Sequence, residues 1–256
     1  MVAPSSSVAL VTGAARRIGR AIALDLAKRG WAVAVHYHGS EADAADLVGR
    51  IVKDGGKAVA LKADLRNEDE TRDLIPRAAA RLGAITCLVN NASLFENDTI
   101  HSVTAESWHG HLQVNLRAPF VLIQEFARQC PKGVDGNVIN MLDERVWNLT
   151  PHFISYTLSK AGLWNLTQTL AMALAPDIRV NGIGPGPTLP SARQSEEQFR
   201  RQWSMMPLKR LIGLDEITRA VRFILDAPAM TGQMIALDGG QHLGWAQPTP
   251  VNKPQE

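Results

Sequence analysis

The chain has 256 residues, of which 45% are hydrophobic and 20% charged, a composition typical of a folded domain rather than a disordered segment. Its 27 basic and 25 acidic side chains are spread along the sequence and leave a formal net charge of +2. This balance argues against a nucleic-acid or membrane surface, since no basic block is present.

The sequence shows no targeting pattern and no characteristic cysteine spacing. The N-terminal stretch lacks the charged and apolar regions of a leader, and no apolar run approaches the roughly 18 residues of a membrane span. The two cysteines, Cys87 and Cys130, show neither a disulfide framework nor metal-ligand spacing. We therefore expect a cytoplasmic protein with no membrane, nucleic-acid or metal partner.

Apolar runs alternate with amphipathic stretches along the chain. The runs expected to form strands are residues 8–12, 32–36, 58–63, 86–91, 137–141, 178–183 and 234–238. Strands that alternate with helices build a mostly parallel sheet covered on both faces. We predict a single-domain α/β fold, a Rossmann-type doubly wound parallel β-sheet, over residues 8–245. Disordered ends are expected at 1–7 and 246–256, and a substrate lid at about 187–214.

A glycine-containing turn, TGAARRIGR at residues 12–20, joins the first predicted strand to the first predicted helix. Gly13 and Gly19 are spaced like the outer glycines of a dinucleotide-binding turn, with Arg17 in the place of the middle glycine. Such a turn lets backbone N–H groups and a helix N-terminus face a pyrophosphate, and an arginine adds positive charge. The alternative is an ordinary strand-to-helix turn.

The second predicted strand ends in His36, Tyr37, His38, Gly39 and Ser40. NAD-selective proteins usually place an acidic residue here to bind the ribose 2′-hydroxyl, but no carboxylate occurs before Glu41. Imidazoles, hydroxyls and Arg17 can instead donate hydrogen bonds to a 2′-phosphate. The segment predicts NADPH as the cofactor. Two alternatives are a metal-binding His-x-His pair and histidines merely exposed at a strand end.

Tyr156 and Lys160 lie four residues apart in a stretch with helical periodicity, so both belong to one helix face. A neighbouring lysine favours the phenolate, which helps the phenol donate its proton to a substrate as hydride arrives from a nicotinamide. The spacing alone is common, and by itself it would favour a surface pair.

Taken together, the motifs of residues 8–243 resemble the short-chain dehydrogenase/reductase family. They are TGAARRIG, Asp64-Leu65, NNAS at 90–93, Asn115 in QVNLRAPF, Tyr156-x-x-x-Lys160 and RVNGIGPGPT at 179–188. The resemblance implies a proton-delivery network of Asn115, Tyr156 and Lys160. The cofactor residues that it and the two segments above imply are Gly13, Arg16, Arg17, Ile18, Gly19, His36, Tyr37, His38, Ser40, Asp64, Leu65, Asn91, Ala92, Ser93, Lys160, Pro185, Gly186 and Thr188.

Departures from the family pattern resemble its pteridine reductase and dihydromonapterin reductase branch. The usual active-site serine, thirteen residues before the tyrosine, is replaced by Asp143. Phe95 matches the aromatic residue that holds a pterin ring against the nicotinamide, and Ser93 matches a residue at the phosphates or pterin. Gly39, where that branch carries an arginine, removes one phosphate contact. The resemblance also implies a homotetramer.

The predicted function is NADPH-dependent reduction of a dihydropterin to its tetrahydro form. Asp143, Tyr156, Lys160 and Asn115 are the expected catalytic residues, and Ser93, Phe95, Asp143 and Tyr156 the expected substrate contacts. A carboxylate can accept hydrogen bonds from an aminopyrimidinone edge or help relay a proton, although Asp143 or Glu144 could also be a solvated loop acid. His109 and His111 are expected on a helix surface. The alternatives are a carbonyl or 3-oxoacyl thioester reductase and an NADPH-binding regulator without turnover.

Overall fold

The computed structural model describes residues 7–191 and 194–244. The predicted disordered ends lie outside these residues except for Ser7, as do residues 192–193 of the predicted lid. Seven parallel strands form one sheet in the order β3-β2-β1-β4-β5-β6-β7. The strands are β1 (Val8–Val11), β2 (Ala32–Tyr37), β3 (Ala58–Lys62), β4 (Cys87–Asn90), β5 (Gly136–Met141), β6 (Ile178–Pro185) and β7 (Met234–Leu237).

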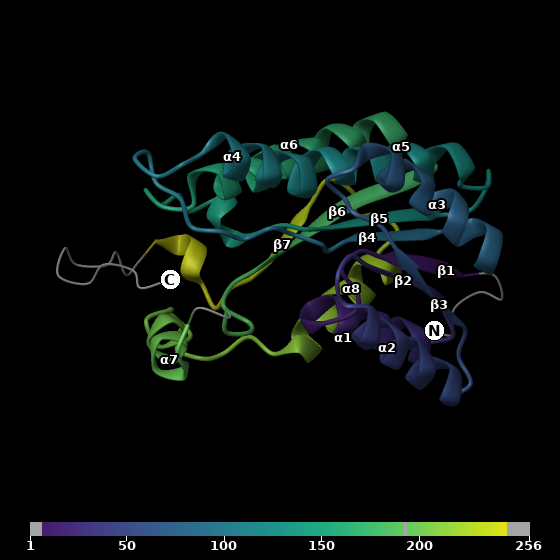
Figure 1. Cartoon of the computed structure of the whole chain (residues 1–256), viewed down its shortest axis with the longest axis horizontal. Helices are drawn as coiled ribbons and strands as arrows, with labels where there is room; N and C mark the ends of the chain where they lie inside the picture. The colour runs from purple at the N-terminus through teal and green to yellow at the C-terminus, as the bar shows by residue number, and fades with distance from the viewer. Residues whose placement is uncertain (1–6, 192–193, 245–256) are drawn as a thin grey trace.

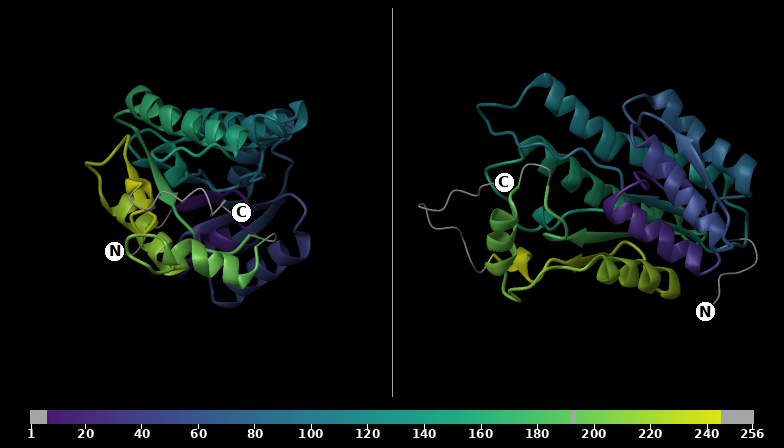
Figure 2. Two further views of the ribbon diagram at one scale, coloured as in Figure 1. Left: turned by 90° about the vertical axis from the view of Figure 1, so that its left-hand side faces the viewer. Right: turned by 60° about the horizontal axis from the view of Figure 1, so that its bottom comes forward.

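Helices connect the strands and cover both faces of the sheet. The α-helices are α1 (Arg17–Lys28), α2 (Glu41–Lys53), α3 (Glu68–Leu82), α4 (Ala105–Leu112), α5 (Ala118–Gln129), α6 (Ile154–Leu174), α7 (Glu196–Ser204) and α8 (Leu214–Asp226). Shorter helical turns are η1 (Gln113–Arg117), η2 (Glu144–Val146) and η3 (Gln241–Leu243). Helices α3 to α6 lie on one face and α1, α2 and α8 on the other, as Figures 1 and 2 show.

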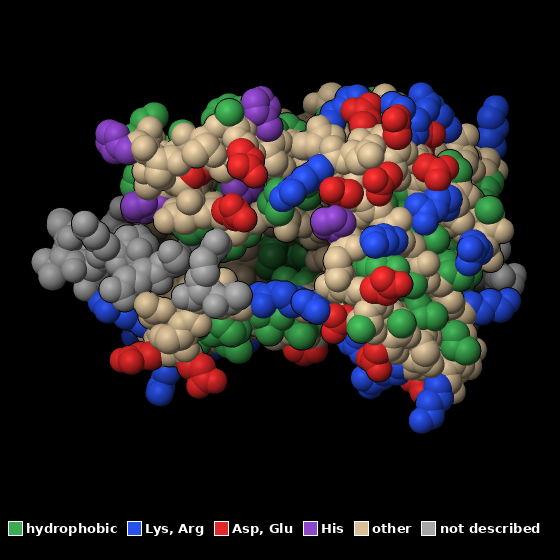
Figure 3. Space-filling model, viewed as in Figure 1, with side chains coloured by type: hydrophobic (Ala, Val, Ile, Leu, Met, Phe, Trp, Pro, Cys, Tyr) green, Lys and Arg blue, Asp and Glu red, His purple; other side chains and the backbone are tan. Residues whose placement is uncertain are grey.

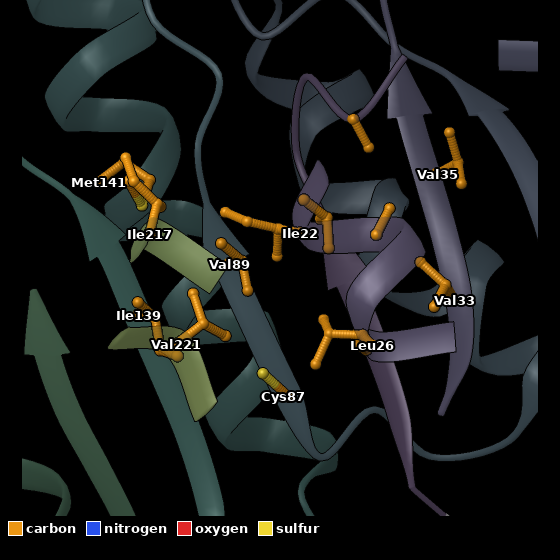
Figure 4. Close-up of a cluster of buried hydrophobic side chains, with 14 of the residues drawn as sticks. Ile22, Leu26, Val33, Val35, Cys87, Val89, Ile139, Met141, Ile217 and Val221 are labelled. Carbon is orange, nitrogen blue, oxygen red and sulfur yellow. The ribbon is translucent and has the colours of Figure 1, made fainter. Parts of the chain in front are cut away.

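The sheet is buried between two apolar clusters, and every residue of its inner strand β1 is apolar and buried. One face packs against Ile22 and Leu26 of α1 and Ile217 and Val221 of α8 (Figure 4). The other face packs against α3 and α5, where Leu74 and Phe126 are fully buried. A parallel sheet covered on both faces requires strands that are apolar throughout, which is the pattern of this sequence.

The strand order reverses at β1, which pairs with β2 on one side and β4 on the other. In open α/β sheets, ligands bind outside the carboxyl ends of the strands at this switch point. Figure 3 shows a hollow between the two helical layers, with hydrophobic atoms at its floor and Lys or Arg side chains beside it. Helix α7, within the predicted lid, lies beyond the carboxyl ends of the strands (Figure 1).

The predicted fold class is confirmed, and each strand lies within two residues of its predicted limits. One local feature that the periodicity did not indicate is the π-helical turn η1. Pro119, near the start of α5, has no N–H to donate to the carbonyl four residues earlier, that of Asn115, and a wider turn avoids the clash. Within the described residues, no helix is long and apolar enough to cross a membrane.

Candidate active site

The turn between β1 and α1 is packed tightly against the end of β4. Gly13 has a φ of +60°, and a Cβ on Gly19 would lie 2.4 Å from the Gly13 carbonyl oxygen and 2.5 Å from Asn91 Nδ2. Asn91 Nδ2 donates to the carbonyl oxygens of Thr12 (2.8 Å) and Gly13 (3.2 Å). Helix α1 has neither a side-chain cap nor an acidic residue in its first turn, so its N-terminus suits an anion.

The arginines of this turn take different directions. Arg17 adopts a φ of +54°, and its guanidinium donates to the carbonyl oxygens of Leu189 (3.1 Å) and Pro190 (2.8 Å) in the segment after β6. Arg16 is exposed and pairs with Asp43 of α2 at 2.5 Å. Arg17 and Ile18, but not Arg16, therefore border the cavity described below.

The structure corrects the role expected for His36. Its side chain is buried, Nδ1 accepts a hydrogen bond from Gly13 N (3.0 Å), and Nε2 pairs with the Ala63 carbonyl oxygen (3.1 Å). Burial lowers the pKa of His36 to about 4, so the ring is neutral at physiological pH and its single N–H is directed at Ala63. His36 fixes the glycine turn to β3 and has no N–H left for a 2′-phosphate.

The other residues at the end of β2 divide between core and surface. Tyr37 is buried in the apolar cluster under α1 and α2. His38 is exposed, with Nε2 3.7 Å from Asp64 Oδ2, while Ser40 precedes α2 without capping it. Leu65, beside Asp64, is buried. Among the predicted donors at this strand end, His38 and Ser40 are the ones that the structure leaves accessible to a phosphate.

Tyr156, Lys160 and Asp143 meet at the carboxyl end of β5. The Tyr156 hydroxyl donates to Asp143 Oδ2 at 2.7 Å. Lys160, one helical turn later on α6, donates from Nζ to the Met141 carbonyl oxygen (2.8 Å), and Nζ lies 5.8 Å from the centre of the Tyr156 ring. The Asp143 side chain is only 13% exposed, so Asp143 is not a solvated loop acid.

Burial determines the proton affinities of this group. Desolvation, and then the charge of Asp143 and its hydrogen bond, raise the pKa of Tyr156 well above its usual value. Desolvation lowers the pKa of Lys160 to about 8, although the Asp143 carboxylate opposes this shift. At neutral pH the tyrosine therefore retains its proton and the lysine is mostly charged, as a general acid and its electrostatic partner require.

Asn115 lies in η1 and contacts the loop after β4. Its Oδ1 accepts from Leu94 N (2.8 Å) and Ser93 Oγ (3.2 Å), and its Nδ2 donates to the Leu94 carbonyl oxygen (2.9 Å) and Ser159 Oγ (3.0 Å). Within the described residues, no hydrogen bond links Asn115 to Tyr156 or Lys160. The place of Asn115 in a proton network stays a prediction. Its hydrogen bond with Ser93 holds that side chain in position directly.

A cavity of about 180 Å³ opens beside Tyr156 and Asp143. Its wall includes Phe95, whose ring stacks on Phe153 at 4.8 Å with planes 1° apart and meets the Tyr156 ring edge-on, also at 4.8 Å. Arg145, Pro185 and Phe199 of α7 are further lining residues. The cavity is therefore flat and aromatic on one side and acidic at its end.

The end of β6 closes the cavity from the other side. Gly186 lies against Asp238, and a Cβ there would come within 2.8 Å of Asp238 Cα. Thr188 is buried, and its hydroxyl donates to the Gly186 carbonyl oxygen at 3.0 Å. Pro185, Gly186 and Thr188 all line the same cavity as Tyr156, so the structure brings these predicted residues together.

Sequence reasoning missed several residues of the site. Thr12 Oγ1 accepts from the N–H groups of Asn91 and Ala92, both at 2.9 Å, and so ties β1 to the loop after β4. Phe153 precedes α6 with a φ of +57°, and Arg145 follows Asp143 with little exposure. Nearness to Asp143 and Tyr156 in the sequence was the signal that could have found Phe153 and Arg145.

His111 was predicted on a helix surface, and this is wrong. His111 is 1% exposed, and its Nδ1 pairs with Ser155 Oγ at 2.7 Å while Nε2 accepts from Glu96 N at 3.2 Å. Ser155 in turn donates to the buried carboxylate of Asp98 from both its backbone N–H and its hydroxyl. His109 is exposed, as expected. The loop after β4 covers His111, which helix periodicity alone could not indicate.

The crevice fits NADPH by its own features. The close approach at Gly13 and Gly19 leaves backbone N–H groups and the α1 N-terminus for a pyrophosphate. A 2′-phosphate would fit beside His38 and Ser40. Gly39 between them is open, since a Cβ there would meet no atom within 4 Å. A metal has weaker support, because both ring nitrogens of His36 are engaged and the described residues contain no cluster of three metal-ligating side chains.

Comparison with known proteins agrees with this geometry. The sequence model of a family described as Enoyl-(Acyl carrier protein) reductase matches residues 13–242. A 3-oxoacyl-[acyl-carrier-protein] reductase, FabG, from Staphylococcus epidermidis is 32% identical over 240 residues, 92% of this chain and 98% of that protein.

Two solved structures with bound cofactor are similar to the chain. FolM alternative dihydrofolate reductase 1 from Brucella canis, complexed with NADP, is 47% identical with a TM-score of 0.90 and covers 96% of this chain and 98% of its own. A blue fluorescent protein from a metagenomic library, in complex with NADPH, is 30% identical with a TM-score of 0.86, covering 92% and 98%. The chain belongs to the short-chain dehydrogenase/reductase family and is an NADP-dependent oxidoreductase.

Proposed function

We propose that the protein uses NADPH to reduce a dihydropterin to its tetrahydro form. The observation that carries the proposal is the Asp143 carboxylate, which stands where the family has a serine and accepts the Tyr156 hydroxyl hydrogen bond at 2.7 Å. A ketone oxygen beside an ionised carboxylate would be repelled, whereas the N–H groups of an aminopyrimidinone edge can donate to it. The likeness to FolM, an alternative dihydrofolate reductase, supports the same substrate class.

The aromatic wall suits a flat heterocycle. Phe95 lines the cavity beside Tyr156, and Phe153 supports it from behind by parallel stacking at 4.8 Å. A pterin ring presents two apolar faces and a polar edge, so it would lie against Phe95 with its edge toward Asp143. A cavity of about 180 Å³ accepts such a ring, while a longer substituent would extend toward the segment after β6.

NADPH, when bound, supplies the hydride. Tyr156 would then turn its hydroxyl proton from Asp143 to the substrate nitrogen beside the reduced carbon. Lys160, fixed on the Met141 carbonyl, would stabilise the phenolate that remains, and Asp143 would hold the donor edge of the substrate. The segment around α7 would exclude water from the cavity, since Phe199 and Gln202 line it.

The second candidate is a carbonyl or 3-oxoacyl thioester reductase, favoured by the likeness to FabG. In that case an oxyanion, rather than a donor edge, would face Asp143, and the serine of the wider family would serve better. An NADPH-binding regulator is the third candidate and is the weakest, because Tyr156 and Lys160 are both positioned for proton transfer. We also propose that the protein is a cytoplasmic homotetramer.

The test is a panel of NADPH-oxidation assays with dihydrobiopterin, dihydromonapterin, dihydrofolate and simple ketones. The wild type should reduce a dihydropterin. Asp143→Ser should lose at least about 10-fold in kcat/KM for the pterin, and this loss should hold at every pH assayed. As a control, Tyr156→Phe should lose about 10²-fold in turnover with NADPH binding intact. An Asp143→Ser variant that kept pterin turnover, or gained ketone reduction over an already active wild type, would defeat the substrate assignment.

A further inference from the structure

Arg145 is a buried cation beside the proposed acid. It lies in η2, two residues after Asp143, and its side chain is 9% exposed. Its Nη1 lies 3.5 Å from Asp143 Oδ2, the same oxygen that accepts the Tyr156 hydroxyl, and its backbone N–H donates to Asp143 Oδ1 at 2.9 Å. Both oxygens of the carboxylate are therefore near Arg145.

Two aromatic rings fix the position of the guanidinium. Arg145 Cζ lies 5.0 Å from the centre of the Phe153 ring and 5.7 Å from that of Phe95. A guanidinium over aromatic faces is stabilised by their negative charge density, and it cannot lose its proton at any pH that the protein survives. The charge beside Asp143 is thus permanent and held in one place.

Such a charge offsets the repulsion that the Asp143 carboxylate would exert on a Tyr156 phenolate. When Tyr156 gives up its proton, a phenolate forms next to a carboxylate whose oxygen is 2.7 Å away, and two like charges in a buried site repel strongly. The serine of the wider family causes no such repulsion. Lys160 alone compensates incompletely, since burial lowers its pKa to about 8 and its charge fades at alkaline pH.

We infer that Arg145 is a positioning residue that acts through Asp143: its fixed positive charge compensates the carboxylate and so makes an aspartate compatible with proton donation by Tyr156. The inference rests on the proposed role of Tyr156 as the acid, but not on the identity of the substrate. The direction of the Tyr156 pKa agrees, because Arg145 lowers it while Asp143 and Glu144 raise it.

The test is a double-mutant cycle of Arg145→Met and Asp143→Ser, with Arg145→Lys as the conservative variant. In the wild-type background, Arg145→Met should reduce kcat at least about 10-fold with the KM for NADPH unchanged, and Arg145→Lys should restore part of it. In the Asp143→Ser background, the same replacement should change kcat less than about 3-fold, because no carboxylate is left to compensate.

The pH profile separates an electrostatic from a structural role. Other charged or titratable groups around Tyr156 are Glu144, Lys160 on α6, Arg17 at the cavity wall and His111 on α4. The His111 ring centre is 6.0 Å from that of Tyr156, and burial lowers the pKa of His111. All four groups are unchanged in the cycle. Loss of Arg145 should move the alkaline limb of kcat upward, because the charge of Arg145 lowers the pKa of Tyr156. An unmoved limb would overturn the inference.

A readout without turnover keeps the inference independent of the proposed function. Urea unfolding of the four proteins should show that Arg145→Met lowers the unfolding midpoint more in the wild type than in Asp143→Ser, since only the former retains an uncompensated buried carboxylate. Additive midpoints together with equal kcat losses in both backgrounds would overturn it. Absence of pterin and ketone turnover in the wild type would instead refute the proposed function, and the unfolding cycle would still decide whether Arg145 compensates the charge of Asp143.

Discussion

Individual residues at the end of β2 show that the same side-chain type can serve opposite purposes two positions apart. His36 is buried and neutral and fixes the glycine turn through Gly13 N, whereas His38 is exposed beside Asp64. The end of the strand explains the difference, because β2 ends at Tyr37: His36 lies within the sheet, where the glycine turn and Ala63 contact it, whereas His38 lies beyond the last strand residue. Burial, rather than residue type, keeps the His36 ring neutral.

The pH dependence of stability should report the burial of His36. Its pKa is about 4 in the folded protein and 6.5 when unperturbed, so the unfolded chain binds a proton that the native state excludes between these values. Stability is therefore fully present above pH 6.5 and falls as the pH decreases toward 4, by about 2 kcal/mol between pH 7 and pH 5 from this group.

Urea unfolding at pH 7 and pH 5 measures this contribution. His36→Gln should flatten the pH dependence by that amount, whatever its effect at pH 7. His38→Gln is the matched control, because His38 is exposed, and it should leave the dependence unchanged. If His36→Gln kept the pH dependence of unfolding that the wild type shows, another group, such as His111, would be the one that binds the proton.

At the scale of elements, helix α6, which carries Tyr156 and Lys160, begins in an unusual way. Its first residues lack a side-chain cap of their own, and Phe153 enters the helix with a φ of +57°. Asp98, from the loop after β4, supplies the missing acceptors: its carbonyl oxygen accepts from Phe153 N (2.8 Å) and its Oδ1 accepts from Ser155 N (3.2 Å). A carboxylate at this end also complements the helix dipole. The loop that carries Phe95 and the helix that carries Tyr156 are thereby joined.

Replacing Asp98 with asparagine should therefore affect both stability and turnover. The variant loses a charged acceptor that is 3% exposed, and we expect it to reduce the free energy of unfolding by about 2 kcal/mol, as for hydrogen bonds to charged groups. Turnover should fall while NADPH binding persists, because Tyr156 follows Ser155 directly. Asp73→Asn, an exposed acid on α3, is the control and should change stability by less than about 0.5 kcal/mol. Equal effects of the two replacements would show that the Asp98 contacts do not hold α6.

For the whole molecule, the sheet order brings the parts of the site together. Five distant chain segments meet because each lies at the carboxyl end of a parallel strand or begins the helix after it. They are residues 12–20, 36–40, 91–95, 143–156 and 185–188. The cofactor crevice lies at the reversal between β1 and β4. Arg17 then links the glycine turn to Leu189 and Pro190, so the first and last thirds of the chain are joined across it.

Cofactor preference should respond to charge at Gly39, the open position in this arrangement. Its Cβ would meet no atom within 4 Å, and its φ lies outside the left-handed region, so an L-residue fits. Gly39→Arg should tighten NADPH binding by about 3- to 10-fold through a new charge-assisted contact with the 2′-phosphate, and Gly39→Asp should weaken NADPH and favour NADH. Fluorescence titration with both cofactors measures this. If the two replacements gave the same NADPH-to-NADH ratio as the wild type, the end of β2 would not contact the 2′-phosphate.

The sequence by itself determined the elements and the chemistry available at their ends. Alternating apolar runs and amphipathic helices specify a parallel sheet, the Gly13–Gly19 spacing specifies the turn, and the spacing of Tyr156 and Lys160 places both on one helix face. These features depend on residues close together in the chain, where periodicity and backbone freedom act directly.

Only the tertiary structure decided which polar groups are buried and what they contact. The hydrogen bond between Asp143 and Tyr156 joins the segment after β5 to α6. His36 is enclosed by the glycine turn and Ala63, and His111 is covered by the loop that carries Glu96. The Arg145 guanidinium lies beside Asp143 and over the rings of Phe95 and Phe153, which come from the loop after β4 and the start of α6. The physical reason is that desolvation and hydrogen bonding at each of these groups are set by segments far away in the sequence.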